Sequence, residues 1–88
     1  MQIQHIYYSS HFGKAFKNLS SQVKKQAIQK EKIFRADCFN PRLKTHKLKG
    51  KLENYWTFSI NYSYRILFEF MENKSVGFID VGDHSIYR

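Results

Sequence analysis

The chain has 88 residues, too few to divide between two hydrophobic cores, so we expect a single domain over residues 1–88. Aromatic residues make up 17% of the sequence, which argues against a disordered chain, and no apolar run approaches the ~20 residues that a membrane span requires. Fifteen Lys and Arg against seven Asp and Glu give a net charge of +8. This charge favours a polyanionic partner, with nucleic acid first and an acidic protein second.

The cysteine content and the first residues indicate a cellular compartment. Cys38 is the single cysteine, so no internal disulfide can form and the core must hold without one. Residues 1–5 have neither the basic nor the apolar segment of a secretory signal peptide. We therefore expect a reducing, cytoplasmic setting and no association with a membrane.

The first half of the chain predicts a strand and two helices. Residues 2–8 are rich in Ile and Tyr and predict a short strand, after which Ser9 and Ser10 are candidate N-caps. Four apolar residues at i, i+3, i+4 and i+7 then predict a helix with one apolar stripe. These residues are Phe12, Ala15, Phe16 and Leu19.

A second helix follows candidate caps at Ser20 and Ser21. Its apolar residues lie near one face, and Glu31 and Arg35 are spaced to form a supporting i,i+4 pair. Pro41 disfavours helical geometry in the residue before it, so we expect this helix to end near Phe39. The apolar face comprises Val23, Ala27, Phe34 and Cys38.

The second half of the chain changes to a period of two, which predicts strands. Residues 55–62 and 64–70 alternate between apolar and polar side chains, and residues 75–81 form a third run after a turn at 71–74. A basic connector, residues 42–54, precedes them, and a short tail follows Gly82 and Asp83.

The resulting order, β-α-α-β-β-β, predicts an α+β fold with a two-helix hairpin packed on one face of the sheet. We expect the sheet face that carries Trp56, Phe58, Ile66 and Phe68 to be buried. Because successive strand side chains point to opposite sides, Arg65 then lies on the other face, which we expect to be open.

Arg65 and the basic connector are candidate phosphate ligands. The planar guanidinium of Arg65 suits a phosphate, although an ion pair with Glu69 or Asp80 is the alternative explanation for a charge within a strand. The connector contains no acid in its most basic stretch and can follow a nucleic-acid backbone, or it is an ordinary solvated loop. Its cations are Arg42, Lys44, Lys47, Lys49 and Lys51.

Two histidines on expected loops are candidate acid–base groups. RNA supplies its own nucleophile, the 2′-OH, so cleavage needs a base, a cation for the phosphorane and an acid for the departing oxygen. His46, Arg65 and His84 fill those roles if the fold brings them together. Tyr87, beside Arg88, can stack on a base or pack on the sheet. We expect no metal or other cofactor, because the histidine spacing matches no ligand motif.

Four segments of the sequence resemble the RelE/ParE superfamily of toxins, and most closely the RelE, YoeB and YafQ messenger-RNA endonucleases of type II toxin–antitoxin pairs. These segments are 46–50 (HKLKG), 55–56 (YW), 60–68 (INYSYRILF) and 80–87 (DVGDHSIY). The resemblance implies a four-stranded, mainly antiparallel sheet with two helices on one side. It also implies metal-independent cleavage of mRNA, often in the ribosomal A site.

The resemblance assigns a role to each candidate residue. Arg65 matches the strand arginine that contacts the scissile phosphate, and His84 matches the histidine that acts as general acid in YoeB-like and YafQ-like toxins. His46 falls where related toxins place the base, although which histidine is acid and which is base stays open. Tyr87 falls near the terminal aromatic residue that positions the base or shares in acid catalysis. Lys49 matches a basic residue of the family that helps to hold phosphate. The expected RNA-binding residues are Lys49, the other connector lysines Lys44, Lys47 and Lys51, and Arg88.

The resemblance also implies a cognate antitoxin, an acidic or amphipathic protein that wraps the toxin and is the main contact to operator DNA. Two other functions remain open at the sequence level. A ParE-like inhibitor of DNA gyrase shares the fold but needs no acid–base pair. A non-catalytic nucleic-acid-binding module would bind RNA with a steep dependence on salt and leave it intact.

Overall fold

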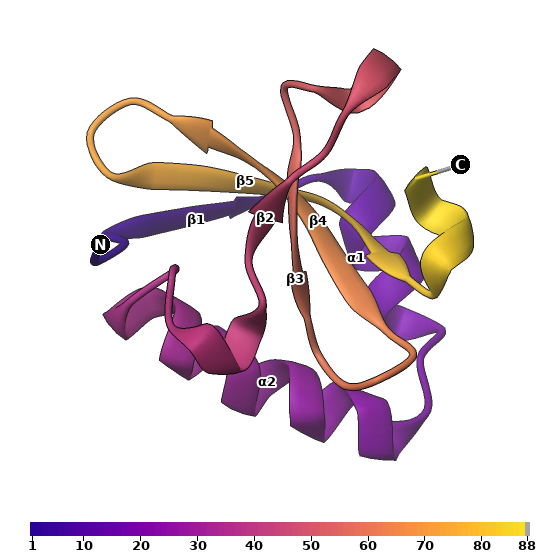
Figure 1. Ribbon diagram of the computed structural model, residues 1–88. Helices are drawn as coiled ribbons and strands as arrows, with labels where there is room; N and C mark the ends of the chain where they lie inside the picture. The colour runs from indigo at the N-terminus through magenta and orange to yellow at the C-terminus, as the bar shows by residue number, and fades with distance from the viewer. Residues whose placement is uncertain (88) are drawn as a thin grey trace.

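A computed structural model describes residues 1–87, and Arg88 and the side chain of Tyr87 lie outside the described residues. The described residues form five strands, two α-helices and three short 3-10 helices (Figure 1). The strands are β1 (His5–Tyr8), β2 (His46–Lys47), β3 (Trp56–Ser59), β4 (Arg65–Met71) and β5 (Ser75–Gly82). The helices are α1 (Ser10–Lys17), α2 (Ser21–Ala36), η1 (Pro41–Leu43), η2 (Gly50–Leu52) and η3 (His84–Tyr87).

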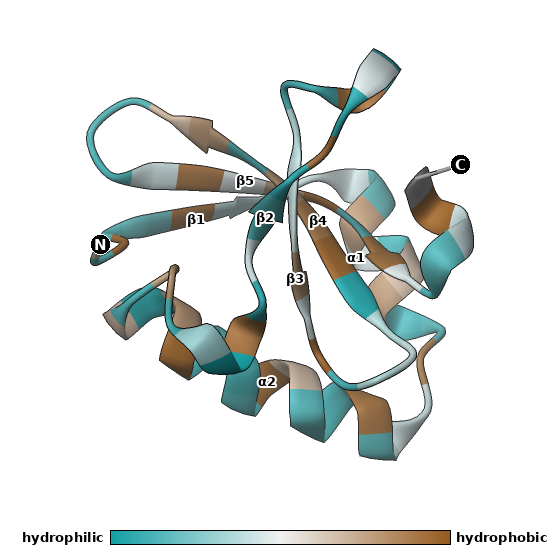
Figure 2. Cartoon of the chain, viewed as in Figure 1, coloured by the Kyte–Doolittle hydropathy of each residue, from teal (hydrophilic) through white to brown (hydrophobic). Residues whose placement is uncertain are grey.

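Both helices begin at the serines that the sequence indicates. The hydroxyl of Ser9 accepts a hydrogen bond from the backbone N–H of Phe12 (2.9 Å), and that of Ser20 accepts one from Val23 (3.2 Å). Each serine therefore satisfies an N–H group that has no partner within its helix. Apolar and hydrophilic positions are interleaved along α2, as expected of a helix with one face buried (Figure 2).

The predicted end of the second helix near Phe39 is wrong, because α2 ends at Ala36. Asp37 has an extended backbone (φ −160°, ψ 103°), and the N–H of Cys38 donates to the carbonyl of Met1 (2.9 Å). The chain thus leaves the helix early to pair with the segment before β1, a contact between parts of the chain that are distant in sequence.

The sheet has the order β1-β5-β4-β3-β2, with β1 parallel to β5 and the other neighbours antiparallel. The predicted α+β class is confirmed, but the expected four strands are five. The additional strand is β2, in which His46 pairs with Thr57 and Lys47 with Trp56. The sequence did not predict β2, because the side chains of this edge strand are polar and exposed and so show no alternation with apolar residues.

The strand predicted over residues 55–62 is too long, because β3 ends at Ser59. The backbone N–H of Ile60 donates to the carbonyl of Tyr64 (2.9 Å), which closes a turn into β4. Alternation of apolar and polar residues continues through Asn61 and Tyr62, so the pattern alone does not mark where pairing stops. The short tail predicted after Asp83 begins with η3.

Four phenylalanines form the centre of the core, between α2 and the sheet. Phe34 of α2 stacks on Phe58, with ring centroids 4.6 Å apart, and meets the rings of Phe68 and Phe78 edge-on at 5.0 and 5.5 Å. None of these four side chains is exposed to solvent. Phe12 of α1 also contacts Phe78, so both helices pack on the same face of the sheet.

The face opposite the helices is less open than expected. Thr57, Ser59 and Leu67 lie on this face by strand alternation, and each is buried. At one end of the face, η3 packs against β4 and β5. Exposed chemistry on this face is therefore restricted to its margins. In the described part of the chain, neither α-helix is both long and apolar enough to cross a membrane.

Replacing Phe34 with Ala removes the ring on which three others pack. We expect Phe34→Ala to lower the free energy of unfolding by about 3–5 kcal/mol, measured by urea denaturation. Tyr62→Ala is the matched control, because Tyr62 is 91% exposed and its removal is expected to change stability by less than about 0.5 kcal/mol. Similar losses in the two variants would contradict the assignment of the core.

Candidate active site

Arg65 begins β4, and the turn before it holds its side chain. Its Nη1 donates to the backbone carbonyl of Asn61 (2.9 Å) and, at 3.4 Å, to those of Tyr62 and Tyr64. The side chain of Asn61 closes the same turn, since its Oδ1 accepts hydrogen bonds from the N–H groups of Ser63 and Tyr64, both at 2.8 Å. The guanidinium is therefore oriented by backbone atoms of a well-bonded turn.

The charge of Arg65 is not matched by a carboxylate among the described side chains. Asp80 instead pairs with His11 (3.1 Å), and none of the ion pairs in this part of the chain involves Glu69. The alternative explanation of Arg65 as an ion pair with Glu69 or Asp80 is therefore wrong. Carbonyl oxygens orient a guanidinium without neutralising it, so a half-buried, planar cation is available to an anionic ligand.

His46 lies on the edge strand β2, with its side chain exposed. Its Nδ1 is 3.0 Å from the carbonyl oxygen of Lys44, an acceptor, so this ring nitrogen must carry a proton to make the hydrogen bond. In the neutral ring, Nε2 then keeps its lone pair. Lys44 has a left-handed backbone (φ 53°) that ends η1, and this turn places its carbonyl beside the imidazole. A neutral ring that makes this hydrogen bond is the tautomer that a base acting through Nε2 requires.

His84 begins η3, two residues after Gly82 at the end of β5. Gly82 lies opposite Arg65 in the ladder between β5 and β4, so His84 follows two residues after the cross-strand neighbour of Arg65. A methyl group at Gly82 would lie 2.6 Å from the Cγ2 atom of Ile86. Glycine at this position therefore allows η3 to close against the strand ends on the face that carries Arg65.

The strand register places His46 and Arg65 on one face. Arg65 lies opposite Ser59, and His46 lies opposite Thr57, two residues away along β3. The path from His46 to Arg65 crosses two strand spacings of about 4.8 Å and runs two residues of about 3.3 Å along the strand, so their Cα atoms lie about 12 Å apart. Two long side chains can approach a single phosphodiester from positions at that separation.

The predicted RNA-binding lysines are all exposed, but they do not share one surface. Lys47 lies opposite Trp56 in the ladder between β2 and β3. The ring of Trp56 packs with Phe39 and Phe70 on the helix-bearing side of the sheet. The side chain of Lys47 therefore starts on that side, opposite to the side chain of His46. The segment with Lys49 and Lys51 projects between β2 and β3 (Figure 1). The roles predicted for the ring of Tyr87 and for Arg88 concern atoms outside the described residues.

Sequence reasoning missed two polar contacts of the site. The amide of Asn61 donates from Nδ2 to Oε1 of Gln26 (2.7 Å) and so fixes the Arg65 turn to α2. His11 pairs with Asp80, the acid that the sequence offers as a possible partner of Arg65. An Asn shortly before a strand is a turn signal, which gave a local indication of the first contact. No local pattern indicates the second, because 69 positions separate the two residues.

The remaining candidate chemistry is not supported in the described residues. Cys38 is fully buried, and burial raises the pKa of its thiol, so it stays protonated and inaccessible, as expected of a small core residue. No group of three His, Cys, Asp or Glu side chains in residues 1–87 is arranged to hold a metal ion.

Solved structures show that this chain has the fold of RelE/ParE toxins. The YoeB/ParE toxin from Agrobacterium tumefaciens superposes with a TM-score of 0.77 at 13% identity, over 92% of this chain and 99% of that one. The E. coli DinJ–YafQ complex superposes with a TM-score of 0.74 at 18% identity, over 98% of this chain and 97% of that one. The archaeal RelE–RelB complex from Pyrococcus horikoshii superposes with a TM-score of 0.74 at 13% identity, over 94% of this chain and 96% of that one. No protein-family model and no curated protein sequence matches the chain.

The contacts of Asn61 predict a measurable cost for its removal. Asn61→Ala deletes three side-chain hydrogen bonds and leaves the amide of Gln26 without its partner, so we expect a loss of about 1–3 kcal/mol in the free energy of unfolding. Urea denaturation measures this loss. Asn54→Ala, at an exposed turn position, is the control and should lie within about 0.5 kcal/mol of the parent. Equal stabilities of the two variants would show that the turn does not depend on Asn61.

Proposed function

We propose that this chain, as one RelE-like domain over residues 1–88, is the toxin of a type II toxin–antitoxin pair and cleaves mRNA. The observation that carries the proposal is the position of Arg65, whose guanidinium is not paired with a described carboxylate and lies on the same sheet face as His46. His84 lies two residues after Gly82, the cross-strand neighbour of Arg65. The fold shared with YoeB, YafQ and RelE toxins supports the same function.

The chemistry requires only groups of the RNA and of this chain. Nε2 of His46 takes the proton of the 2′-OH, and the oxygen attacks the adjacent phosphorus. Arg65 stabilises the charge on the equatorial oxygens of the phosphorane. His84, in its protonated form, gives a proton to the departing 5′-oxygen. The P–O5′ bond breaks, and the products are a 2′,3′-cyclic phosphate and a 5′-OH.

The proposed partners follow from charge and from the neighbours. A net charge of +8 favours RNA, and we propose mRNA on the ribosome as the substrate. The solved DinJ–YafQ and RelE–RelB complexes support a cognate antitoxin, through which operator DNA would be contacted.

Removing Arg65 or His84 is expected to abolish cleavage while the fold survives, because Arg65 is bonded only to a turn and His84 is exposed. Arg65→Ala and His84→Ala should each lower the cleavage rate roughly 10²–10⁴-fold, measured by mapping mRNA ends in a translating ribosome extract. His5→Ala, an exposed histidine on β1, is the control and should cleave like the parent. Full growth arrest by both active-site variants would reject this site, and DNA breaks in place of RNA ends would indicate a gyrase inhibitor.

A substrate with sulfur in place of the bridging 5′-oxygen separates the roles of the two histidines. A thiolate leaves without protonation, so the acid becomes dispensable and the base does not. We expect this substrate to restore cleavage by His84→Ala and not by His46→Ala. The opposite pattern would exchange the two roles.

The exposed lysines of the β2–β3 connection are expected to act on affinity and not on chemistry. Lys49→Ala and Lys51→Ala should each weaken RNA binding and reduce the slope of log K against log salt by about one, measured by fluorescence titration. Lys32→Ala on α2 serves as the matched control, because its side chain is equally exposed but lies on the helix layer. If Lys32→Ala changes the slope as much as the connector variants, the RNA does not follow this connection.

A further inference from the structure

A hollow of about 460 Å³ opens where β1 meets the β4–β5 hairpin, at the end of the sheet away from η3 (Figure 1). Tyr7 of β1 and Glu69 and Met71 of β4 line it, together with residues of the hairpin turn. Gly77 of β5 pairs with Tyr7 on one side and with Glu69 on the other, so a residue without a side chain lies between them. We call the place formed by Tyr7, Gly77 and Glu69 the slot.

The slot lies on the same face of the sheet as Arg65. Glu69 is four residues after Arg65 in β4, and strand side chains alternate, so both emerge on one face. Val76 and Phe78, the neighbours of Gly77, are buried in the core on the helix side, so Gly77 belongs to the opposite face. Four residues of about 3.3 Å place the Cα atoms of Arg65 and Glu69 about 13 Å apart. The candidate active site and the slot thus occupy two margins of one face.

Gly77 keeps the slot open. A Cβ atom there would lie 3.4 Å from Sδ of Met71 and 3.6 Å from Cγ of Glu69, which are ordinary contacts, and its φ is not positive. Neither close packing nor backbone conformation therefore requires a glycine. The Cα atoms of Tyr7 and Glu69 are two strand spacings of about 4.8 Å apart, and a planar ring stacks at about 3.5–4.0 Å. The gap therefore admits one planar ring beside Tyr7, with Glu69 within reach of its edge.

The walls of the slot offer an exposed aromatic ring and an acid that is not paired with a cation. Tyr7 is 56% exposed, on the face away from the core. Glu69 is half-buried and forms no ion pair with the described side chains. An exposed ring can stack on a flat ligand, and an ionised carboxylate accepts hydrogen bonds through both oxygens. The matching ligand is planar and has two adjacent N–H donors on one edge.

Guanine is the RNA base that fits this description. Its N1–H and N2–H₂ groups lie side by side on the Watson–Crick edge, whereas each of the other three bases has one donor group on that edge. The carboxylate of Glu69 also repels phosphate, so the slot suits a base and not the backbone. An arginine side chain of another protein has similar donors, but the net charge of +8 opposes a cationic partner and favours RNA.

We propose that the slot binds an unpaired guanine of the RNA, which stacks on Tyr7 and donates from N1 and N2 to the carboxylate of Glu69. The inference rests on the proposed function in one respect, that the RNA on this face is the substrate. Because Glu69 and Arg65 are about 13 Å apart, the guanine takes no part in the chemistry. It selects the sequences that are held with a phosphate at Arg65.

The test uses the full chain and uridine oligomers with 2′-O-methyl groups, which lack the attacking hydroxyl and are not cleaved. One oligomer is uridine throughout, a second has one central guanine, and a third has inosine in its place, which lacks the N2 amino group. We expect the guanine oligomer to bind at least about fivefold more tightly than the other two, measured by fluorescence anisotropy.

Three variants each remove one part of the slot: Tyr7→Ala the ring, Glu69→Gln the paired acceptors, and Gly77→Val the gap. Each should bind the guanine and uridine oligomers alike. Valine suits a strand, and its Cβ would meet only side-chain atoms that can move, so Gly77→Val is expected to fold. Glu53→Gln is the matched control, because it removes the same charge at an exposed position outside the slot and should keep the preference for guanine.

Equal binding of the three oligomers by the parent would overturn the inference, as would a preference for guanine that survives in any one of the slot variants. Guanosine monophosphate that binds as tightly as the guanine oligomer would show a site for a free nucleotide. N-acetylarginine amide that binds as tightly would show a site for a cationic side chain. Either of these two results would also overturn the assignment to RNA.

Cleavage of mRNA by the same preparations separates this inference from the proposed function. A parent that cleaves mRNA but binds the guanine and uridine oligomers alike overturns the slot alone. A parent that prefers the guanine oligomer but leaves mRNA intact overturns the proposed function alone.

Discussion

The packing of Phe34 on Phe58, Phe68 and Phe78 decides which way each strand residue points. Once α2 covers these rings, every second residue of β3 and β4 is committed to the core, and the residues between them face the other side. Arg65 is one residue from Ile66, which is buried with the rings. A shift of one residue in register would turn the guanidinium into the core, where it has no partner, so the apolar packing positions the charge.

The candidate active site lies at the margin of its sheet face because the centre of that face is occupied. Thr57 and Leu67 are buried there, and η3 closes over the strand ends where Gly82 leaves room for Ile86. Arg65 is consequently held by the turn before β4 and not by a neighbouring carboxylate. A cation oriented by carbonyl groups keeps its charge for a ligand, which is what a phosphate site requires.

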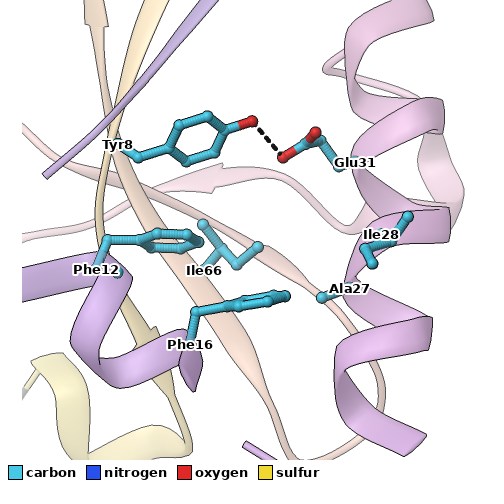
Figure 3. A pocket seen from close by; sticks show the side chains of 8 residues that line it. Tyr8, Phe12, Phe16, Ala27, Ile28, Glu31 and Ile66 are labelled. Carbon is cyan, nitrogen blue, oxygen red and sulfur yellow. Dashed lines mark hydrogen bonds between the residues drawn. The ribbon is translucent and has the colours of Figure 1, made fainter. Parts of the chain in front are cut away.

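The two faces of the sheet differ in their chemistry. The strand face carries Arg65 and His46, the groups proposed to act on RNA, and the helix face carries an apolar cavity beside Gly13, between α1, α2 and β4 (Figure 3). The proposed slot at Gly77 lies at another margin of the strand face, so a single RNA strand can reach both Arg65 and the slot without leaving that face.

The sequence by itself determined what depends on near neighbours. Helix starts at Ser9 and Ser20, the alternation of β3 and β4, and the side on which Arg65 emerges all follow from local hydrogen bonding and periodicity. Contacts between distant segments decided the rest: the end of α2, the pairing of β2, the capture of Asp80 by His11, and the hollow beside Gly13. These features depend on which surfaces come into contact after folding, and the spacing of residues along the chain does not indicate those contacts.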